Sequence, residues 1–303
     1  MSDYHLSVLL EQSVAGLAVN PEGTYVDVTF GGGGHSRAIL QALGPEGRLL
    51  AFDRDADALA NTISDPRFTL IHEDFRYMKN FLRLHGVSRV DGVLADLGVS
   101  SHQFDEAGRG FSTRFDAELD LRMDRRQTTT AKDIVNTASE EELRQILVLY
   151  GELPNAYHMV KAIVSARNEA PILTTFDLKR VLERQVPRNQ ENKYYAMVFQ
   201  ALRIEVNGEL EALKAMLAQA VEMLNPGGRL VVISYHSLED RLVKNMMKTG
   251  NFDGEVKKDF YGNLLAPLKP VTRKPVTPSD VELAANPRSR SAKLRIAEKM
   301  PQQ

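Results

Sequence analysis

The sequence has no cysteine among its 303 residues. This excludes disulfides, thiolate zinc sites, cysteine-held iron–sulfur clusters and every reaction that needs a thiol nucleophile. Long apolar runs are also missing, because stretches such as residues 230–233 fall far short of the roughly 20 residues that span a bilayer. The first residues lack the basic region and cleavage site of a signal peptide. We therefore expect a soluble, cytoplasmic protein, and nothing in the sequence requires a metal.

A strong charge of one sign is absent as well, since the formal net charge is −2. The distribution is nevertheless uneven. Residues 255–303 hold ten Lys/Arg and five Asp/Glu, a net charge of +5, which leaves −7 for the first 254 residues. Any polyanionic partner such as RNA should therefore involve the C-terminal segment.

Strand and helix patterns alternate along the first hundred residues, which favours a doubly wound, mostly parallel sheet with helices on both faces. Strands are expected at residues 25–30, 48–52, 68–71, 92–95, 229–235 and 292–297, and helices at residues 35–43, 55–61, 76–84 and 207–224. From about residue 104 to residue 203 only helix signals occur, including capping boxes that begin at Ser139 and Thr174.

The domain organisation follows from this break in the rhythm. We expect a catalytic α/β domain formed by residues 1–103 and 204–303, interrupted by an all-α domain at residues 104–203 that would recognise a substrate. A proline-rich, basic segment at residues 268–278 should be extended and exposed.

Four consecutive glycines at residues 31–34 separate the first strand from the first helix of the sheet. Such a loop can wrap a ligand at the helix N-terminus, although a tight turn without a ligand is the simpler alternative. A dinucleotide fingerprint would place its third glycine where this chain has Ser36. Asp53, after the second strand, could accept hydrogen bonds from the ribose of either NAD or S-adenosylmethionine, or could merely cap a helix.

Asp96 ends the fourth predicted strand, and ligands of open α/β sheets bind at the carboxyl ends of the strands. Asp27, Asp53 and Asp96 would then line one rim, and Phe75 would offer an aromatic wall for adenine. This arrangement indicates a nucleoside pocket. The alternative is that the acids cap helices and Phe75 belongs to the core.

Several long motifs make the chain recognisable. They read VTFGGGGHSRAIL, DLGVSSHQFDEAGRGFS, ELDLRMD, FQALRIEVNGELEAL, LNPGGRLVVISYHSLEDRLVK and NPRSRSAKLRIAE. Over residues 5–298 the chain closely resembles the bacterial 16S rRNA cytosine-N4 methyltransferases of the RsmH (MraW) family. The resemblance implies a Rossmann-like class I fold, S-adenosylmethionine as cofactor, the small ribosomal subunit or its precursor as partner, and cytosine 1402 of the decoding region as target.

The resemblance also implies a set of cofactor-binding residues, namely Gly33, Gly34, His35, Asp53, Phe75, Asp96 and Gln103. The chain departs from the family at residues 193–198, which read KYYAMV where the family has a pattern close to HPATRT. No RNA contact is carried over for that stretch.

The missing cysteine also bears on the reaction, because methylation of cytosine at C5 normally requires one. An exocyclic amine needs only a positioned hydrogen-bond acceptor. Asp96 is the expected acceptor, although Asp96-Leu97-Gly98-Val99 departs from the usual Pro-Pro-aromatic motif. His236 is the second candidate for a substrate contact, or caps the helix that follows it.

The expected RNA contacts are basic side chains of the C-terminal segment, unless they form only a solvated face. They are Arg288, Arg290, Lys293 and Arg295, with Lys257 and Tyr261 as outlying candidates. Two other functions stay open at this point: an NAD-dependent oxidoreductase and a non-catalytic assembly factor. Titration with S-adenosylhomocysteine and with NADH separates all three.

Overall fold

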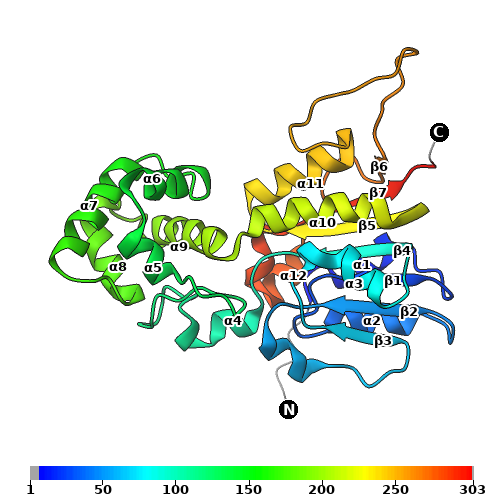
Figure 1. The fold of residues 1–303 in the computed structure, drawn as a ribbon, viewed down its shortest axis with the longest axis horizontal. Helices are drawn as coiled ribbons and strands as arrows, with labels where there is room; N and C mark the ends of the chain where they lie inside the picture. Colours follow the sequence, from blue (N-terminus) through cyan, green and yellow to red (C-terminus); the bar gives the residue numbers. More distant parts are fainter. Residues whose placement is uncertain (1–6, 302–303) are drawn as a thin grey trace. The chain divides into compact units, whose positions relative to one another are not determined.

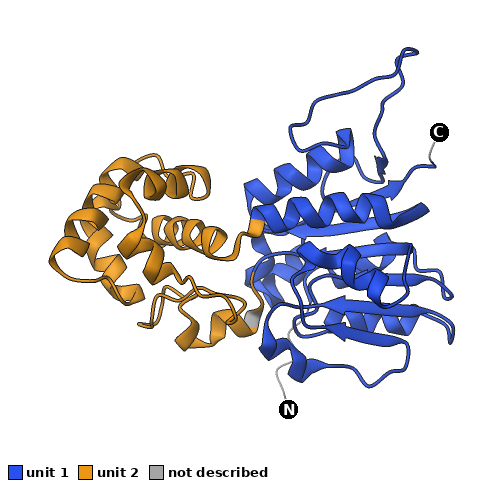
Figure 2. Ribbon diagram, in the orientation of Figure 1, with its two compact units in different colours: residues 1–98, 210–303 blue, residues 99–209 orange. Residues whose placement is uncertain are grey.

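The computed structural model describes residues 7–301 and divides into two compact units (Figure 2). Unit 1 combines Met1–Gly98 with Leu210–Gln303, and unit 2 is the continuous segment Val99–Glu209. The insertion predicted over residues 104–203 thus begins five residues earlier and ends six residues later in the structure. Each unit contains its own hydrophobic core.

Unit 1 is built on one seven-stranded sheet with the order β3-β2-β1-β4-β5-β7-β6 (Figure 1). Neighbouring strands among β1 to β5 pair in parallel, whereas β7 pairs antiparallel with both β5 and β6. The strands are β1 Thr24–Asp27, β2 Arg48–Phe52, β3 Phe68–Ile71, β4 Val90–Asp96, β5 Leu224–Ser234, β6 Leu268–Pro270 and β7 Lys293–Lys299. The chain reverses direction across the sheet between β1 and β4, which creates a topological switch point.

Helices cover both faces of this sheet (Figure 1). Side chains alternate between the faces along each strand, so Val93 and Leu230 join the core under α3 and α10, whereas Leu94 and Val231 join the core under α1 and α2. The helices are α1 Leu10–Leu17, α2 Gly34–Ala42, α3 Met78–Leu84, α10 Glu209–Met223, α11 Ser237–Thr249 and α12 Asp280–Ala285, with 3₁₀ turns at Ala56–Asn61, Phe75–Tyr77 and Pro287–Ser291. The predicted doubly wound Rossmann-like fold is confirmed.

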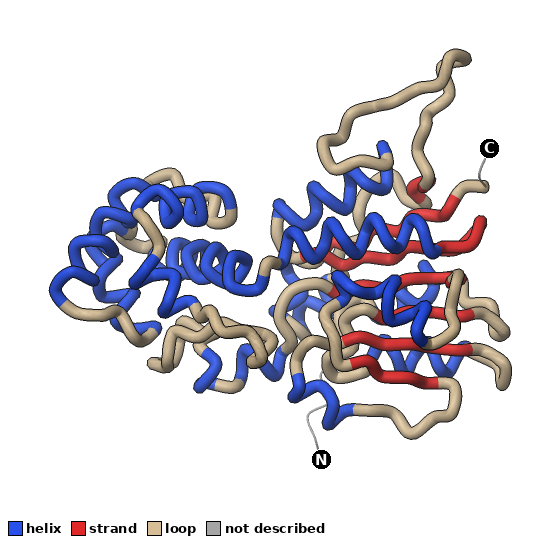
Figure 3. The backbone as a smooth tube through the Cα atoms, in the orientation of Figure 1, coloured by secondary structure: helices blue, strands red, loops and turns tan. Residues whose placement is uncertain are grey.

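Unit 2 consists of helices and connecting loops (Figure 3). The helices are α4 Ser101–Asp105, α5 Ala131–Thr137, α6 Glu140–Leu149, α7 Ala156–Glu169, α8 Thr175–Leu182 and α9 Glu191–Asn207, with 3₁₀ turns at Ala107–Arg109 and Glu183–Gln185. The capping boxes predicted at Ser139 and Thr174 are confirmed, because each hydroxyl accepts a hydrogen bond from the backbone N–H three residues later. The apolar faces of the helices of unit 2 meet in a core that includes Leu143, Met159 and Leu178.

The proline-rich segment begins in an extended conformation, as expected, but its first residue is not exposed. Residues 268–270 form β6, and Leu268 is 2 % exposed because it packs into the core of unit 1. Pro270 can occupy this place because β6 is an edge strand, where a missing N–H is tolerated. Among residues 7–301, no helix combines the length and apolar character that crossing a membrane requires.

Candidate active site

The carboxyl ends of the central strands gather the acids that the sequence assigns to a ligand rim. Asp27 and Asp96 are the last residues of β1 and β4, and Asp53 directly follows β2. Because β1 pairs in parallel with both β2 and β4, the three positions meet at one edge of the sheet. This edge includes the switch point of the fold.

The glycine loop between β1 and α2 lies on the same edge. Gly33 precedes α2 with a φ of 76°, in the left-handed region. Gly34 packs so closely that an added Cβ would lie 2.0 Å from the hydroxyl oxygen of Ser7. Around Gly31 and Gly32, by contrast, no described residue beyond their chain neighbours lies within 4 Å of an added Cβ. The loop thus has an open side beside the N-terminus of α2, where backbone N–H groups can meet a ligand.

Asp53 connects this loop to β2. Its carboxylate accepts hydrogen bonds from the backbone N–H groups of Gly31 at 2.7 Å and Asp55 at 2.8 Å. Burial raises the pKa of Asp53 to about 6, and the two hydrogen bonds oppose that rise. Each carboxylate oxygen offers a second lone pair. Asp53 can therefore hold the loop and still accept hydrogen bonds from ligand hydroxyl groups.

Asp96 is the centre of a half-buried network of polar side chains. The phenol of Tyr235 donates a 2.7 Å hydrogen bond to its Oδ1, and Nδ1 of His35 lies 3.8 Å from its Oδ2. Burial raises the pKa of Asp96 to about 6, against the opposing effects of His35 and Tyr235. Burial, together with the charge of Asp96, also raises the pKa of Tyr235. Asp96 is therefore a carboxyl group that takes up a proton at a higher pH than an ordinary aspartate does, near pH 6.

His35 has a defined orientation in this network. Its Nε2 lies 3.1 Å from the carbonyl oxygen of Val8, which can only accept, so this nitrogen carries a proton. The other nitrogen, Nδ1, faces Asp96. The side chain of His35 is buried, so a contact with a cofactor would come from its backbone.

Asp27 differs from the other two acids because it is 0 % exposed. It accepts hydrogen bonds from the hydroxyl of Ser36 at 2.7 Å and from the backbone N–H of Thr29 at 3.1 Å. Thr29 in turn accepts a hydrogen bond from the backbone N–H of Asp96 at 2.6 Å. Asp27 thus braces the glycine loop against the sheet. Ser36, which breaks the dinucleotide fingerprint, is part of this brace.

The remaining predicted contacts have different surroundings. Phe75 begins the 3₁₀ turn after β3 and packs partly against the core of unit 1. Gln103 lies in unit 2, where its Oε1 accepts a 3.0 Å hydrogen bond from the backbone N–H of Ser100. His236 precedes α11 but forms no side-chain cap, and its Nε2 lies 3.1 Å from Oε1 of Glu239. The geometry therefore does not support the helix-cap interpretation of His236.

Two of the four predicted RNA-binding bases are paired with an acid of unit 1. Arg295 on β7 donates to both carboxylate oxygens of Asp240 on α11, at 2.6 and 3.1 Å. Nζ of Lys293 lies 3.6 Å from the same acid. Arg288 and Arg290 lie in the preceding 3₁₀ turn and are exposed. The four basic side chains therefore differ in exposure, and Arg288 and Arg290 are the more accessible two.

Tyr235 is the residue of this network that sequence reasoning missed. Asp96 pairs with Ile233 across β4 and β5, and Tyr235 lies two residues beyond Ile233. Residues two apart on a strand share a face, so this position directs the phenol towards Asp96. The signal for Tyr235 in the sequence is its position at the end of the strand that pairs with β4.

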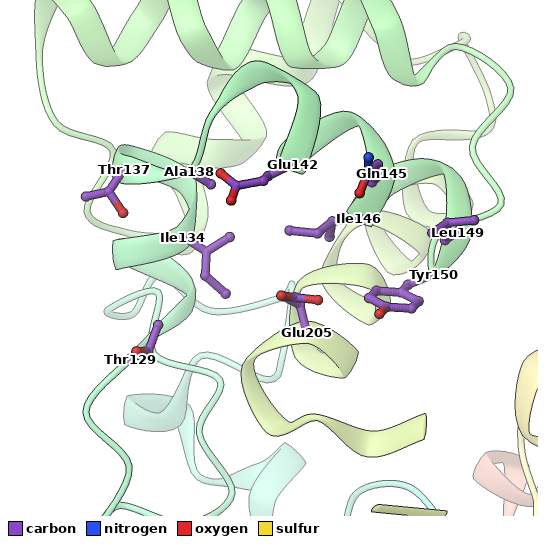
Figure 4. Close-up of a pocket in the computed structure, with 10 residues that line it drawn as sticks. All are labelled: Thr129, Ile134, Thr137, Ala138, Glu142, Gln145, Ile146, Leu149, Tyr150 and Glu205. Carbon is purple, nitrogen blue, oxygen red and sulfur yellow. The ribbon is translucent and has the colours of Figure 1, made fainter. Parts of the chain in front are cut away.

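Unit 2 has a hollow of about 480 Å³ that none of the predicted site residues lines. Figure 4 shows its lining, which comprises Thr129, Ile134, Thr137, Ala138, Glu142, Gln145, Ile146, Leu149, Tyr150 and Glu205. Burial raises the pKa of Glu205, and the charge of Glu142 adds to that rise. Two acids in one hollow repel phosphate, so it does not suit the RNA backbone.

Comparison with known proteins identifies the family. A sequence model of the MraW methylase family matches residues 2–300. This chain belongs to the MraW methylase family. It is 58 % identical over 296 residues to the ribosomal RNA small subunit methyltransferase H of Bacteroides thetaiotaomicron, which covers 98 % of this chain and 97 % of that protein. The protein of the same name from Flavobacterium johnsoniae is 56 % identical over 298 residues, with 98 % of each chain covered.

Among solved structures, an rRNA methylase from Streptococcus thermophilus matches with a TM-score of 0.45 and 11 % identity, covering 98 % of this chain and all of that chain (100 %). The family match confirms the resemblance found in the sequence. The mostly parallel seven-stranded sheet with helices on both faces confirms the predicted methyltransferase fold. The cofactor of this MraW methylase is S-adenosylmethionine. The rim of unit 1 fits it, because an open glycine loop and a carboxylate with spare lone pairs, Asp53, lie together.

Proposed function

We propose that this MraW methylase transfers a methyl group to the exocyclic N4 of a cytidine in 16S rRNA, within the small ribosomal subunit or its precursor in the cytoplasm. The target to which the family resemblance points is cytosine 1402 of the decoding region. The observation that carries the proposal is the half-buried, hydrogen-bonded pair of Asp96 and Tyr235 at the strand ends of a methylase without cysteine.

Bound S-adenosylmethionine supplies an electrophilic methyl group. The protein has to place the acceptor amine in line with this group and to accept a proton from the amine. Asp96 suits the second task, because a carboxyl group whose pKa is about 6 is ionised at neutral pH and is more basic than an ordinary aspartate. An amine that donates one N–H to Asp96 has its lone pair directed away from that bond and towards the methyl group.

Tyr235 and His35 hold this acceptor in place. The phenol of Tyr235 occupies Oδ1 of Asp96, and the ring of His35, itself held by Val8, approaches Oδ2. Lone pairs on Oδ2 then stay available to an incoming amine, because the 3.8 Å separation is longer than a hydrogen bond. Asp96 is the catalytic residue of the proposal, and Tyr235 is its positioning residue.

The remaining contacts are assigned by combining the resemblance with the geometry. Asp53 would bind the ribose hydroxyls, Phe75 would lie against adenine, and the open side of the glycine loop would receive the rest of the cofactor. The other cofactor contacts proposed are Gly33, Gly34, His35, Asp96 and Gln103. Unit 2 is inserted directly after the strand that carries Asp96, and we assign RNA recognition to it. Of the four basic residues of the C-terminal segment predicted to bind RNA, Arg288 and Arg290 are the exposed ones, and we assign phosphate contacts to them. We assign His236 a further contact with the RNA.

The experiment is methylation of a small ribosomal subunit whose RNA carries 5-fluorocytidine at the target. A C5 enzyme is trapped as a covalent adduct on this base, whereas N4 transfer should proceed and release the product. A denaturing gel and mass spectrometry of the digested nucleosides read both results, with unmodified subunits as the control. A gel-stable adduct, or a methyl group on ring carbon or ribose oxygen, would refute N4 transfer. Binding without any methylation would indicate a non-catalytic assembly factor.

A further inference from the structure

Between α11 and β6 the chain forms an ordered hairpin that projects from unit 1 (Figure 1). Its two arms are joined by hydrogen bonds from the N–H of Leu265 to the carbonyl of Lys257 and from the N–H of Asp259 to the carbonyl of Asn263, both 2.9 Å. The carboxylate of Asp259 closes the turn by accepting the N–H groups of Tyr261 at 2.9 Å and Asn263 at 2.8 Å. Hydrogen bonds within the hairpin therefore define the backbone conformation at its tip.

Two adjacent aromatic rings stand at the tip of this hairpin. Phe260 is 98 % exposed and Tyr261 is 86 % exposed, and their centroids lie 5.6 Å apart with nearly perpendicular planes. Single exposed apolar residues are common on protein surfaces. The pair at this tip is not such a single residue. Asp259 closes the turn through backbone N–H groups, so the turn does not require aromatic side chains, and each exposed ring loses the free energy that burial would give. Such a pair indicates a partner that covers it.

The charge around the rings indicates the chemistry of that partner. Residues 256–274 contain five basic residues and one acidic residue, a net charge of +4, so the rest of this chain of net charge −2 carries −6. All five bases are exposed, and none has an ion-pair partner among residues 7–301; they are Lys257, Lys258, Lys269, Arg273 and Lys274. The single acid, Asp259, is already bonded within the turn, and those hydrogen bonds hold its pKa low.

The hairpin lies far from the carboxyl rim of the sheet. Helix α11 starts just after β5 ends, at that rim, and packs back along β6 and β7 for 13 residues. At 1.5 Å per residue it carries the chain about 20 Å away before the hairpin begins. Any partner of Phe260 and Tyr261 is therefore different from the nucleobase that receives the methyl group.

We propose that this hairpin is a second RNA contact, in which Phe260 and Tyr261 stack on unpaired bases of ribosomal RNA while the neighbouring lysines hold phosphates. The inference rests on the proposed function for the identity of the RNA. Stacking on aromatic rings beside basic side chains is a general mode of binding single-stranded RNA. Leu264 and Leu265 extend the exposed apolar surface, so a ribosomal protein is the competing occupant. The five basic side chains without an ion-pair partner among residues 7–301 favour RNA.

The chain has no tryptophan, which allows a direct test. Phe260→Trp introduces the one tryptophan of the chain at the tip, where it can be excited at wavelengths that the tyrosines do not absorb, and stacking with a nucleobase quenches indole fluorescence. Leu84→Trp, at a site 77 % exposed on α3, serves as the matched control. Titration with protein-free 16S rRNA and with small ribosomal subunits should quench Phe260→Trp in both cases and leave Leu84→Trp unchanged. Quenching by subunits alone would mean a protein partner, and no quenching by either would mean no contact; both results overturn the proposal.

A second measurement tests the contact in the working enzyme. The double variant Phe260→Ala, Tyr261→Ala should raise KM for small subunits at least about fivefold, since each base–aromatic stack contributes substantially to binding. Its kcat, its affinity for S-adenosylmethionine and its melting temperature should stay unchanged, as should KM of the control Leu84→Ala. An unchanged KM would contradict the proposal. If the parent enzyme made no N4-methylcytidine, the proposed function would fail, whereas the titration with 16S rRNA would still decide the RNA contact.

Discussion

The strand-end rim and the C-terminal segment both concentrate charged side chains, but they treat those charges in opposite ways. At the rim, burial raises the pKa of Asp53 and Asp96 to about 6, and each carboxylate is held by hydrogen bonds. In the segment, Arg288 and Arg290 are exposed, and charges there are screened by water and salt. A change at the rim should therefore alter catalysis or cofactor binding, whereas a change in the segment should alter only the affinity for RNA.

The largest effect is expected for Asp96→Asn. The amide keeps the size of the side chain and an oxygen for Tyr235 but cannot accept a proton from the amine. Because a positioned base contributes about 10²- to 10⁴-fold, kcat should fall at least about 100-fold. Calorimetry should find the affinity for S-adenosylhomocysteine reduced by no more than a few-fold. A variant whose kcat stays within fivefold of the parent would remove Asp96 from the chemistry.

Asp53→Ala should weaken the binding of S-adenosylmethionine at least about tenfold. The ribose hydroxyls lose a charged acceptor, and such hydrogen bonds contribute roughly 1.5 to 3 kcal/mol each. The change also removes the hydrogen-bond acceptor of the backbone N–H groups of Gly31 and Asp55. Asp53→Asn, which retains one acceptor oxygen, should lose less. Calorimetry measures both, and equal affinity of parent and folded alanine variant would exclude Asp53 from the cofactor site.

Tyr235→Phe should produce a smaller loss that depends on pH. The phenol stabilises the ionised form of Asp96, so its removal should raise the pKa of Asp96 further. Because the ionised form is the active one, kcat falls as pH drops through about 6 in the parent, and this fall should move to higher pH in the variant. Near pH 6 we expect a loss of about three- to tenfold that shrinks towards pH 8. Tyr157→Phe, on α7, is the control. A profile identical to the parent's would show that Tyr235 does not act through Asp96.

The contrast between the two regions also explains which features of the structure could be predicted from the sequence and which could not. The period-two and helical patterns locate the strands and the rim, because apolar periodicity and strand-end position depend only on local sequence. The bond from Tyr235 to Asp96 joins residues 139 apart in the chain, and the pairing of Arg295 with Asp240 joins residues 55 apart. Both depend on which strands become neighbours, which the sequence of either segment alone does not encode. Likewise, the exposure of Lys257 and Tyr261 depends on the hairpin that the folded chain forms, which their local sequence does not reveal.

The smallest expected effect separates the bases of the C-terminal segment from one another. If Arg288 and Arg290 each contact a phosphate, the double variant Arg288→Gln, Arg290→Gln should flatten the slope of log K against log salt by about 0.7 per contact on single-stranded RNA. Arg295→Gln is the matched single change, and it should leave the slope nearly unchanged because Asp240 already pairs with this guanidinium. Filter binding to 16S rRNA between roughly 50 and 200 mM salt measures all three proteins. A parental slope in the double variant would make these arginines part of a solvated face. A slope that flattens equally in Arg295→Gln would mean that the ion pair with Asp240 opens when RNA binds, and the rim and the segment would then differ less than their structures indicate.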